Sequence, residues 1–239
     1  MVYLKKAWKK IKRFWNFVWN DNSPLSWLLA LVISYLIIKF IFFPVLEFSL
    51  GTSFPLVAVV SGSMEHRLSP VTDINGNIVV EENGNHLYSI CGKTIKESNR
   101  LGFFSRKINL ERFWQSCGQW YNDFNITKED FSGFRFSRGF NRGDIMIIYN
   151  PSPEKIQVGD IVVFDSEFLS YPIIHRVVSK DENNEGFFFS TKGDHNPAQN
   201  PDEKTIHESR LHGKAVARVP LVGYVKIGLF ELKNWLFAR

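Results

Sequence analysis

The order of apolar and polar residues along the chain predicts a membrane helix near the N-terminus. Residues 25–43 form a mostly apolar run whose only charged residue is Lys39. As a helix, such a run would span roughly 28 Å, which is close to the hydrocarbon thickness of a bilayer. We expect this helix to end before Pro44, because proline interrupts helical hydrogen bonding. The length of the run and the arm in front of it favour an anchor over a cleaved signal peptide or a buried core helix.

Both ends of the chain have apolar residues at helical spacing. In residues 1–20, apolar residues that include Trp8 and Trp15 share one face, and lysines fill the opposite face. This pattern predicts a cationic amphipathic helix on the anionic inner leaflet of a membrane. Residues 221–239 have an apolar stripe with three charges beside it. Those charges would cost about 8 kcal/mol at mid-bilayer, so we expect an interfacial helix, with a partner-assisted second span as the alternative.

The segment between these ends has the pattern of a β domain. Runs rich in β-branched and aromatic residues, bounded by Gly, Pro, Asn or Asp, predict short strands. They lie at residues 54–60, 145–149, 161–164, 173–178, 186–191 and 214–219. We therefore expect a mainly β domain over residues 54–220. Residues 70–141 have no clear period, which indicates an inserted subdomain or a long elaborated loop.

The distribution of charge predicts how the chain crosses the membrane. The net charge is +5, but six basic residues lie within the first 13 positions, so the remainder is close to neutral. A basic body that binds nucleic acid is therefore excluded. The first basic residue after the apolar run is Arg67. By the positive-inside rule, the N-terminus is cytoplasmic and the β domain is outside, with a single span in the cell membrane or the endoplasmic reticulum membrane.

The two cysteines, Cys91 and Cys117, both lie in the insertion. Their spacing matches no zinc-binding or redox motif. They pair if the domain faces an oxidising compartment, or they are two unrelated buried thiols. The histidines outside the strands show no metal-ligand spacing. We predict no metal and no cofactor.

Two residues could form a nucleophile and its base. Ser63 lies in the run Ser61-Gly62-Ser63-Met64, directly after an apolar strand, where a tight turn would expose it. An ordinary serine-rich turn is the alternative. A serine needs a base to become a nucleophile. His175 lies in the apolar strand 173–178, so it is either that base or a satisfied core histidine.

A third group could orient that histidine. The loop at 191–197 is rich in Gly, Asp, Asn and Pro, and it contains Asp194, with Asp202 further on. A carboxylate in this region would orient His175 and stabilise its imidazolium form. Capping of the turn is the alternative role for either aspartate.

Five blocks in this order resemble the signal peptidase I family, the serine peptidases of family S26, in its archaeal and endoplasmic-reticulum branch. The blocks are SGSME, GDIVVF, IIHRVV, TKGDHN and VPLVGYVKI. The resemblance implies a signal-peptidase-like β catalytic domain that removes signal peptides from exported preproteins. It covers neither the insertion nor the basic arm.

The resemblance also implies roles for single residues. Ser63 matches the nucleophile, and His175 matches the general base at the strand position where the bacterial branch has a lysine. The family pattern places an acidic residue after the TKGD block, for which Asp202 is our first choice and Asp194 the second. The Ser61 hydroxyl, with the Ser63 N–H, would bind the oxyanion.

Two other functions remain as alternatives at this point. A related peptidase with a lysine base is disfavoured, since the strand 173–178 has no lysine. A membrane-tethered β domain without enzymatic activity could bind exported chains or assemble a complex. As an enzyme, the chain would act on signal-peptide-bearing preproteins at the bilayer, with room for accessory membrane subunits.

Overall fold

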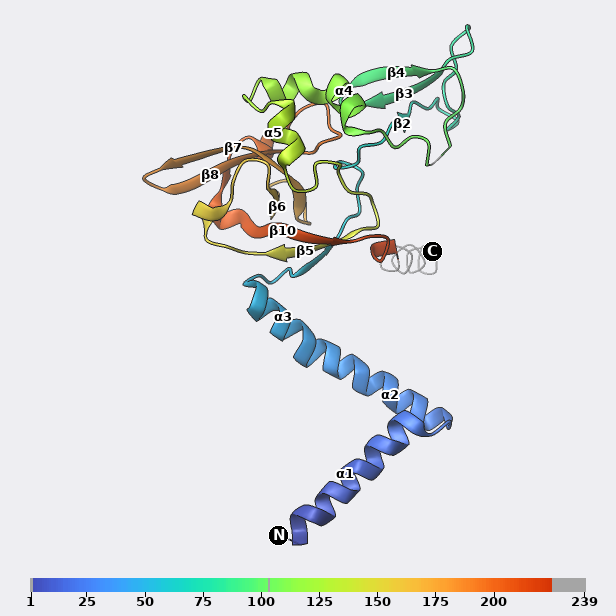
Figure 1. Cartoon of the computed structure of the whole chain (residues 1–239), viewed down its shortest axis with the longest axis vertical. Coiled ribbons are helices and arrows are strands. Elements are labelled where there is room, and N and C mark those ends of the chain that lie inside the picture. The colour runs from blue at the N-terminus through green and yellow to red at the C-terminus, as the bar shows by residue number, and fades with distance from the viewer. Residues whose placement is uncertain (1, 103, 225–239) are drawn as a thin grey trace. The chain divides into compact units, whose positions relative to one another are not determined.

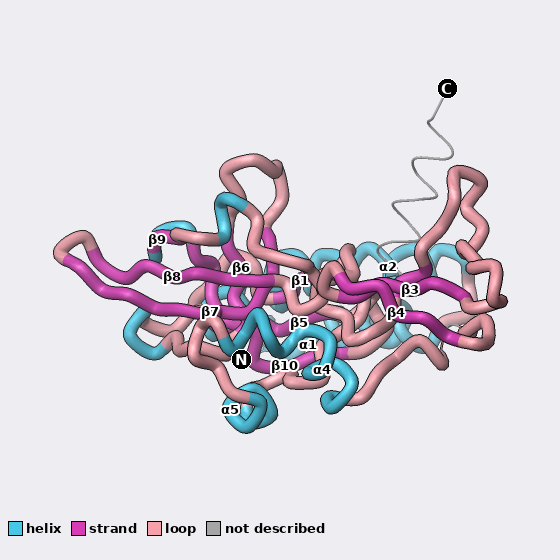
Figure 2. The backbone as a smooth tube through the Cα atoms, turned by 90° about the horizontal axis from the view of Figure 1, so that it is seen from above, coloured by secondary structure: helices cyan, strands magenta, loops and turns pink. Residues whose placement is uncertain are grey.

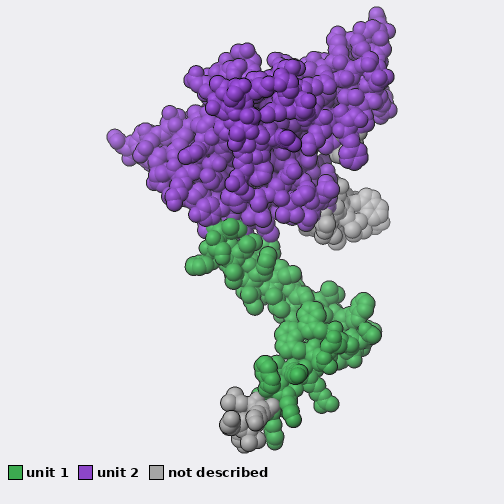
Figure 3. All heavy atoms as spheres, viewed as in Figure 1, with its two compact units in different colours: residues 1–50 green, residues 51–239 purple. Residues whose placement is uncertain are grey.

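The structure, a computed structural model, describes residues 2–102 and 104–224. The chain divides into two compact units, residues 1–50 and 51–239 (Figure 3). The predicted C-terminal helix at 221–239 falls almost entirely outside the described residues.

The first unit is helical. Helix α1 spans Val2–Asn20, α2 spans Pro24–Ile37, a π-helical turn spans Ile38–Phe42, and α3 spans Phe43–Leu50 (Figure 1). From Pro24 to Leu50 the helix is continuous over 27 residues, and the mean hydropathy of an 18-residue stretch within it reaches 2.5. It is therefore long and apolar enough to cross a membrane, as the sequence predicts.

The prediction that this helix ends before Pro44 is wrong. The Phe43 N–H donates to the carbonyl of Ile38, five residues earlier, which is the pattern of a π turn. A proline lacks the N–H that a regular helix would pair. Since the π turn already interrupts the regular pairing immediately before Pro44, the helix absorbs the proline and continues to Leu50.

The second unit is built on a seven-stranded antiparallel sheet with the order β1-β5-β10-β6-β7-β8-β9. The strands are β1 Leu56–Ala58, β5 Ile145–Tyr149, β6 Ile161–Phe164, β7 Ile173–Asn183, β8 Gly186–Lys192, β9 Ile206–His207 and β10 Leu211–Val219. Short 3₁₀ helices span Pro153–Lys155, Pro201–Glu203 and Glu208–Arg210. The mainly β class predicted from the sequence is confirmed.

The predicted strands differ from the observed ones mainly at their ends. β5 and β6 match the predicted ranges, whereas β7 and β10 extend further. β1 is only three residues long and lies at an edge, paired with β5. All four residues of β6 are buried, because apolar side chains pack against both faces of this central strand.

The predicted insertion, residues 70–141, has regular secondary structure and belongs to the second compact unit. It contains most of the small sheet β2 Ser69–Pro70, β3 His86–Ile90 and β4 Lys93–Glu97, followed by helices α4 Leu110–Asn122 and α5 Lys128–Gly133. In Figures 1 and 2 the small sheet lies at the opposite end of the unit from the β7–β8 hairpin.

The insertion has a core of its own, which also packs on the main sheet. Phe113, Tyr121 and Phe131 are fully buried in one cluster with Val178 of β7. A disulfide between Cys91 and Cys117 joins the β3–β4 turn to α4. The sequence left this pairing open. The insertion therefore packs against β7, the strand that carries His175.

Candidate active site

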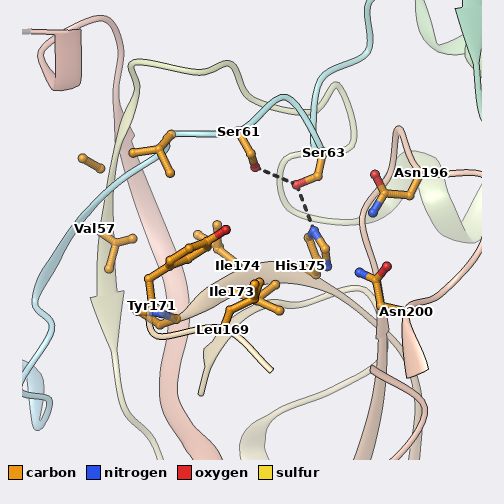
Figure 4. A pocket seen from close by; sticks show the side chains of 13 residues that line it. Val57, Ser61, Ser63, Leu169, Tyr171, Ile173, Ile174, His175, Asn196 and Asn200 are labelled. Atoms are coloured by element: carbon orange, nitrogen blue, oxygen red, sulfur yellow. Dashed lines mark hydrogen bonds between the residues drawn. The ribbon is translucent and has the colours of Figure 1, made fainter. Parts of the chain in front are cut away.

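Ser63 lies on a tight loop that follows the edge strand β1. The loop is anchored at both ends, because Val59 and Met64 are buried in the core of the sheet. The Val59 N–H donates to the carbonyl of Asp144, and the Phe140 N–H donates to the carbonyl of Met64. This anchoring holds the Ser63 side chain at the mouth of a pocket (Figure 4).

His175 projects from β7 toward Ser63. Its Nε2 lies 2.9 Å from the Ser63 hydroxyl oxygen, and the imidazole is almost completely buried. The next residue, Arg176, points to the opposite face of the strand, as alternation along a strand requires. The structure thus brings together the two residues that the sequence predicts as a pair.

The carboxylate on the other side of His175 belongs to Glu203. Its Oε1 accepts a hydrogen bond from His175 Nδ1, and Glu203 is fully buried. A carboxylate can only accept, so Nδ1 carries the proton and Nε2 is left to accept from Ser63. Glu203 is held in turn by the Asn200 N–H at 2.8 Å and by the Thr191 hydroxyl at 3.3 Å.

Neither of the aspartates expected to orient His175 contacts it. Asp202 accepts hydrogen bonds from the hydroxyl of Ser166 at 2.7 Å and from the N–H of Glu167 at 3.0 Å. Asp194 is fully buried and pairs with Arg176, on the other face of β7. The first aspartate therefore caps a loop, and the second neutralises a buried cation.

Sequence reasoning missed Glu203 because it considered only aspartates in this region. A usable signal was present in the run Asn200-Pro201-Asp202-Glu203. An asparagine cap, a proline and a glutamate three residues after the cap are the pattern of a capping box, and both of its hydrogen bonds form here. That cap turns Glu203, rather than Asp202, toward His175.

The remaining predicted residue, Ser61, lies beside the nucleophile candidate. The Ser61 and Ser63 hydroxyl oxygens are 3.1 Å apart. Figure 4 shows the two hydroxyls and His175 in series along one wall of the pocket. A donor at Ser61 would therefore be close to the oxygen of any carbonyl group whose carbon Ser63 attacks.

The pocket next to these groups has a volume of about 330 Å³. Its walls are largely apolar and come from β1, from the loop after it, from the loop before β7 and from the start of β7. They include Val57, Ala58, Val60, Leu169, Tyr171, Ile173 and Ile174, with Asn196 and Asn200 at the polar end. Within the described ranges, no group of His, Cys, Asp or Glu residues has the arrangement of a metal site.

A buried carboxylate, a histidine and a serine in series beside an apolar cleft form the arrangement of serine hydrolases. No family model matches the chain. The chain is 32% identical to the signal peptidase complex catalytic subunit SEC11 of Scheffersomyces stipitis over 124 residues, 49% of this chain and 74% of that protein. At this identity and coverage, the chain belongs to the signal peptidase I family.

Two further relatives have the same name. The subunit from Lodderomyces elongisporus is 36% identical over 105 residues, 41% of this chain and 63% of that protein. The subunit from Metarhizium acridum is 36% identical over 103 residues, 41% of this chain and 59% of that protein. The chain thus spans about three fifths of the length of these two relatives.

Proposed function

We propose that this chain is a serine endopeptidase that removes signal peptides from exported preproteins. The observation that carries the proposal is the continuous series from Glu203 through His175 to Ser63 at the mouth of an apolar pocket. Membership of the signal peptidase I family supports the same substrate class. The relatives are named as the catalytic subunits of a signal peptidase complex.

In the proposed reaction, His175 Nε2 takes the proton of the Ser63 hydroxyl as Ser63 attacks the scissile carbonyl carbon. Glu203 stabilises the imidazolium that forms and keeps the ring in the required tautomer. The Ser61 hydroxyl and the Ser63 N–H donate to the oxyanion, and loss of one such donor costs about 2.7–4 kcal/mol. His175 then protonates the leaving amine, and an acyl-enzyme remains.

Water completes the cycle. His175 takes a proton from a water molecule, which attacks the ester between Ser63 and the signal peptide. The tetrahedral intermediate collapses, the Ser63 hydroxyl regains its proton, and the signal peptide leaves with a free carboxylate.

The edge strand β1 offers a place for the substrate backbone. Among the described residues β1 pairs only with β5, so its other edge is available for an added strand. Val57 and Ala58 of this strand also line the pocket. A peptide added along β1 would place alternate side chains toward the pocket and its scissile bond near Ser63. Small side chains before the cleavage point suit the limited space.

The helix Pro24–Leu50 would hold this domain at the membrane where preproteins emerge. We place its N-terminal end in the cytoplasm and the β domain on the outer side, because the basic residues gather before the span. The membrane is the cell membrane or that of the endoplasmic reticulum. Since the relatives are named as subunits of a complex, accessory membrane subunits are part of the proposal.

Helix α1 suits an interfacial position on an anionic leaflet. Trp8, Ile11, Trp15 and Trp19 fall on one side at helical spacing and are exposed. Residues 6–20 contain no acidic residue. The opposite side carries Lys6, Lys9, Lys10 and Arg13, and Lys12 lies at the border of the aromatic face. An aromatic face beside an uncompensated cationic face matches the boundary between acyl chains and anionic headgroups.

The junction between α1 and the span is also fixed. The Ser26 hydroxyl lies 2.8 Å from the carbonyl oxygen of Phe17 and 2.9 Å from that of Val18. Both Ser26 and Val18 are buried. These contacts fasten the end of α1 to the start of α2, so an interfacial α1 would set the depth of the span.

The first test is cleavage of a secretory preprotein by the detergent-solubilised chain. We expect the wild type and a Ser209→Ala control to cleave after a small residue, and Ser63→Ala to lose activity by at least about 10³-fold. Product masses from mass spectrometry locate the cut. Equal cleavage by Ser63→Ala would remove Ser63 as the nucleophile, and cleavage by none of the proteins would oppose an autonomous peptidase.

A second test separates the two neighbouring carboxylates. Glu203→Gln keeps the shape of the side chain but removes its charge, so kcat should fall by roughly 10²–10⁴-fold. Asp202→Asn is the matched control and should keep kcat within about threefold, since Asp202 contacts the 166–167 loop and Arg210 rather than His175. The reverse ranking in steady-state kinetics would restore Asp202 as the orienting residue.

The position of α1 is tested with spin labels at Ala7→Cys, on the apolar face, and Asn16→Cys, on the polar face. In nanodiscs with phosphatidylserine, the first label should be shielded from a water-soluble relaxation agent and the second exposed. Changing Lys6, Lys9 and Lys10 to Gln should lower the equilibrium constant for binding of α1 to the interface by about fivefold per charge. Changing Lys93, Lys155 and Lys204 to Gln is the control. Equal exposure of both labels in every lipid would contradict the proposal.

A further inference from the structure

A buried network lies behind the catalytic pair, on the other face of β7. Asp194 Oδ1 accepts from Arg176 Nε at 2.9 Å and from the Tyr121 hydroxyl at 2.8 Å. Asp194 Oδ2 accepts from Arg176 Nη2 at 2.7 Å and lies 3.0 Å from His66 Nε2. Burial alone would raise the pKa of Asp194, but Arg176 and the hydrogen bonds outweigh it and hold that pKa well below its usual range.

The residues beside Asp194 touch the catalytic pair. The His195 N–H donates to the carbonyl of Ser63 at 2.8 Å. A Cβ at Gly193 would lie 2.8 Å from His175 Nε2 and 2.9 Å from the Ser63 carbonyl oxygen, so only glycine allows this approach. Residues 193–195, named here the supporting loop, therefore fix where Ser63 lies relative to His175. Asp194 is the anchor of that loop.

The insertion contributes most of the aromatic side chains around Asp194 and its charged neighbours. Phe113 of α4 stacks on His66 with ring centroids 3.7 Å apart. Phe131 of α5 lies 4.7 Å from the Arg176 guanidinium carbon. Trp120 and Tyr121 both face the buried ammonium group of Lys192, whose pKa burial lowers to about 8. Aromatic rings of the insertion therefore cover the charged groups that hold the supporting loop.

The disulfide-linked part of the insertion contacts the supporting loop a second time. The Cys91 N–H donates to the carbonyl of His195 at 3.0 Å, and Cys91 is bonded to Cys117 of α4. Tyr121 lies one helical turn further along α4. Both contacts to the loop thus come from elements that the disulfide joins.

We propose that the insertion positions the active site, with Tyr121 as a positioning residue that holds Asp194 and thereby the Ser63–His175 pair. The Tyr121 hydroxyl is the insertion's direct hydrogen bond to the Asp194 carboxylate among the described residues. It remains a donor at neutral pH, because burial raises the pKa of Tyr121 well above 10. The effect on turnover rests on the proposed function, whereas the effect on the supporting loop does not.

The test compares two buried tyrosines, of which only Tyr121 donates a hydrogen bond to the supporting loop. Tyr121 and Tyr88 are both fully buried in the core of the insertion. The Tyr88 hydroxyl accepts from the N–H of Leu101 at 2.7 Å, within the insertion. Tyr121→Phe and Tyr88→Phe in the full chain therefore each remove one buried hydroxyl and keep the ring. Only Tyr121→Phe removes a hydrogen bond to the supporting loop.

Amide hydrogen exchange, followed by mass spectrometry, measures how often the supporting loop opens, and it does not require enzymatic activity. We expect Tyr121→Phe to speed exchange in residues 193–197 by about tenfold or more, as for loss of a hydrogen bond to a charged group. Tyr88→Phe should speed exchange near residue 101 and leave 193–197 unchanged. In preprotein cleavage, Tyr121→Phe should lower kcat about tenfold with KM within twofold, and Tyr88→Phe should change neither.

The outcomes are distinct. Equal exchange in residues 193–197 for the two variants would overturn the positioning role, whatever the activity. Faster exchange there in Tyr121→Phe alone, with no cleavage by the wild type, would keep the positioning role and reject the proposed function. Faster exchange with unchanged kcat would show that the supporting loop does not set the reaction geometry, and that part of the proposal would fail.

Discussion

The buried ion pair between Arg176 and Asp194 is the interaction on which the catalytic region depends. Both side chains are removed from water, and a buried charge without its partner typically costs 3–5 kcal/mol. The pair therefore ties β7 to the supporting loop. Because side chains alternate along a strand, the residue before Arg176 faces the opposite side, where it meets Ser63 and Glu203. β7 thus has the Arg176–Asp194 ion pair on one face and the Ser63–His175 pair on the other.

This arrangement is the basis for the proposed role of the insertion in positioning the active site. The resemblance to signal peptidases covers the strands and loops around Ser63 and His175, whereas residues 70–141 lie outside it. Yet the insertion's aromatic core encloses Arg176, Asp194 and Lys192. Removing the insertion would expose these charges to water and weaken their coupling. Residues 70–141 accordingly belong to the same compact unit as the main sheet.

The sequence predicts the elements that depend mainly on residues close together in the chain. β5 and β6 are visible as β-branched runs, and His175 is visible as a polar residue in an apolar strand. Glu203 was missed because a turn of the 3₁₀ helix, not distance along the chain, decides which carboxylate faces the histidine. The insertion's packing could not be predicted, because Tyr121 meets Asp194 across 73 positions. The continuation of the helix past Pro44 was missed for a different reason, because the π turn before it leaves little trace in the composition.

Activation of Ser63 by His175 is the step on which the proposed reaction depends. Its most direct measurement is labelling by a fluorophosphonate, which reacts with activated serines, followed by peptide mapping of the adduct. If His175 activates Ser63, the wild type gives one adduct, on Ser63, and His175→Ala loses that adduct. Labelling of Ser63 at the wild-type rate in His175→Ala, or an adduct on another serine while Ser63 stays unlabelled, would contradict it.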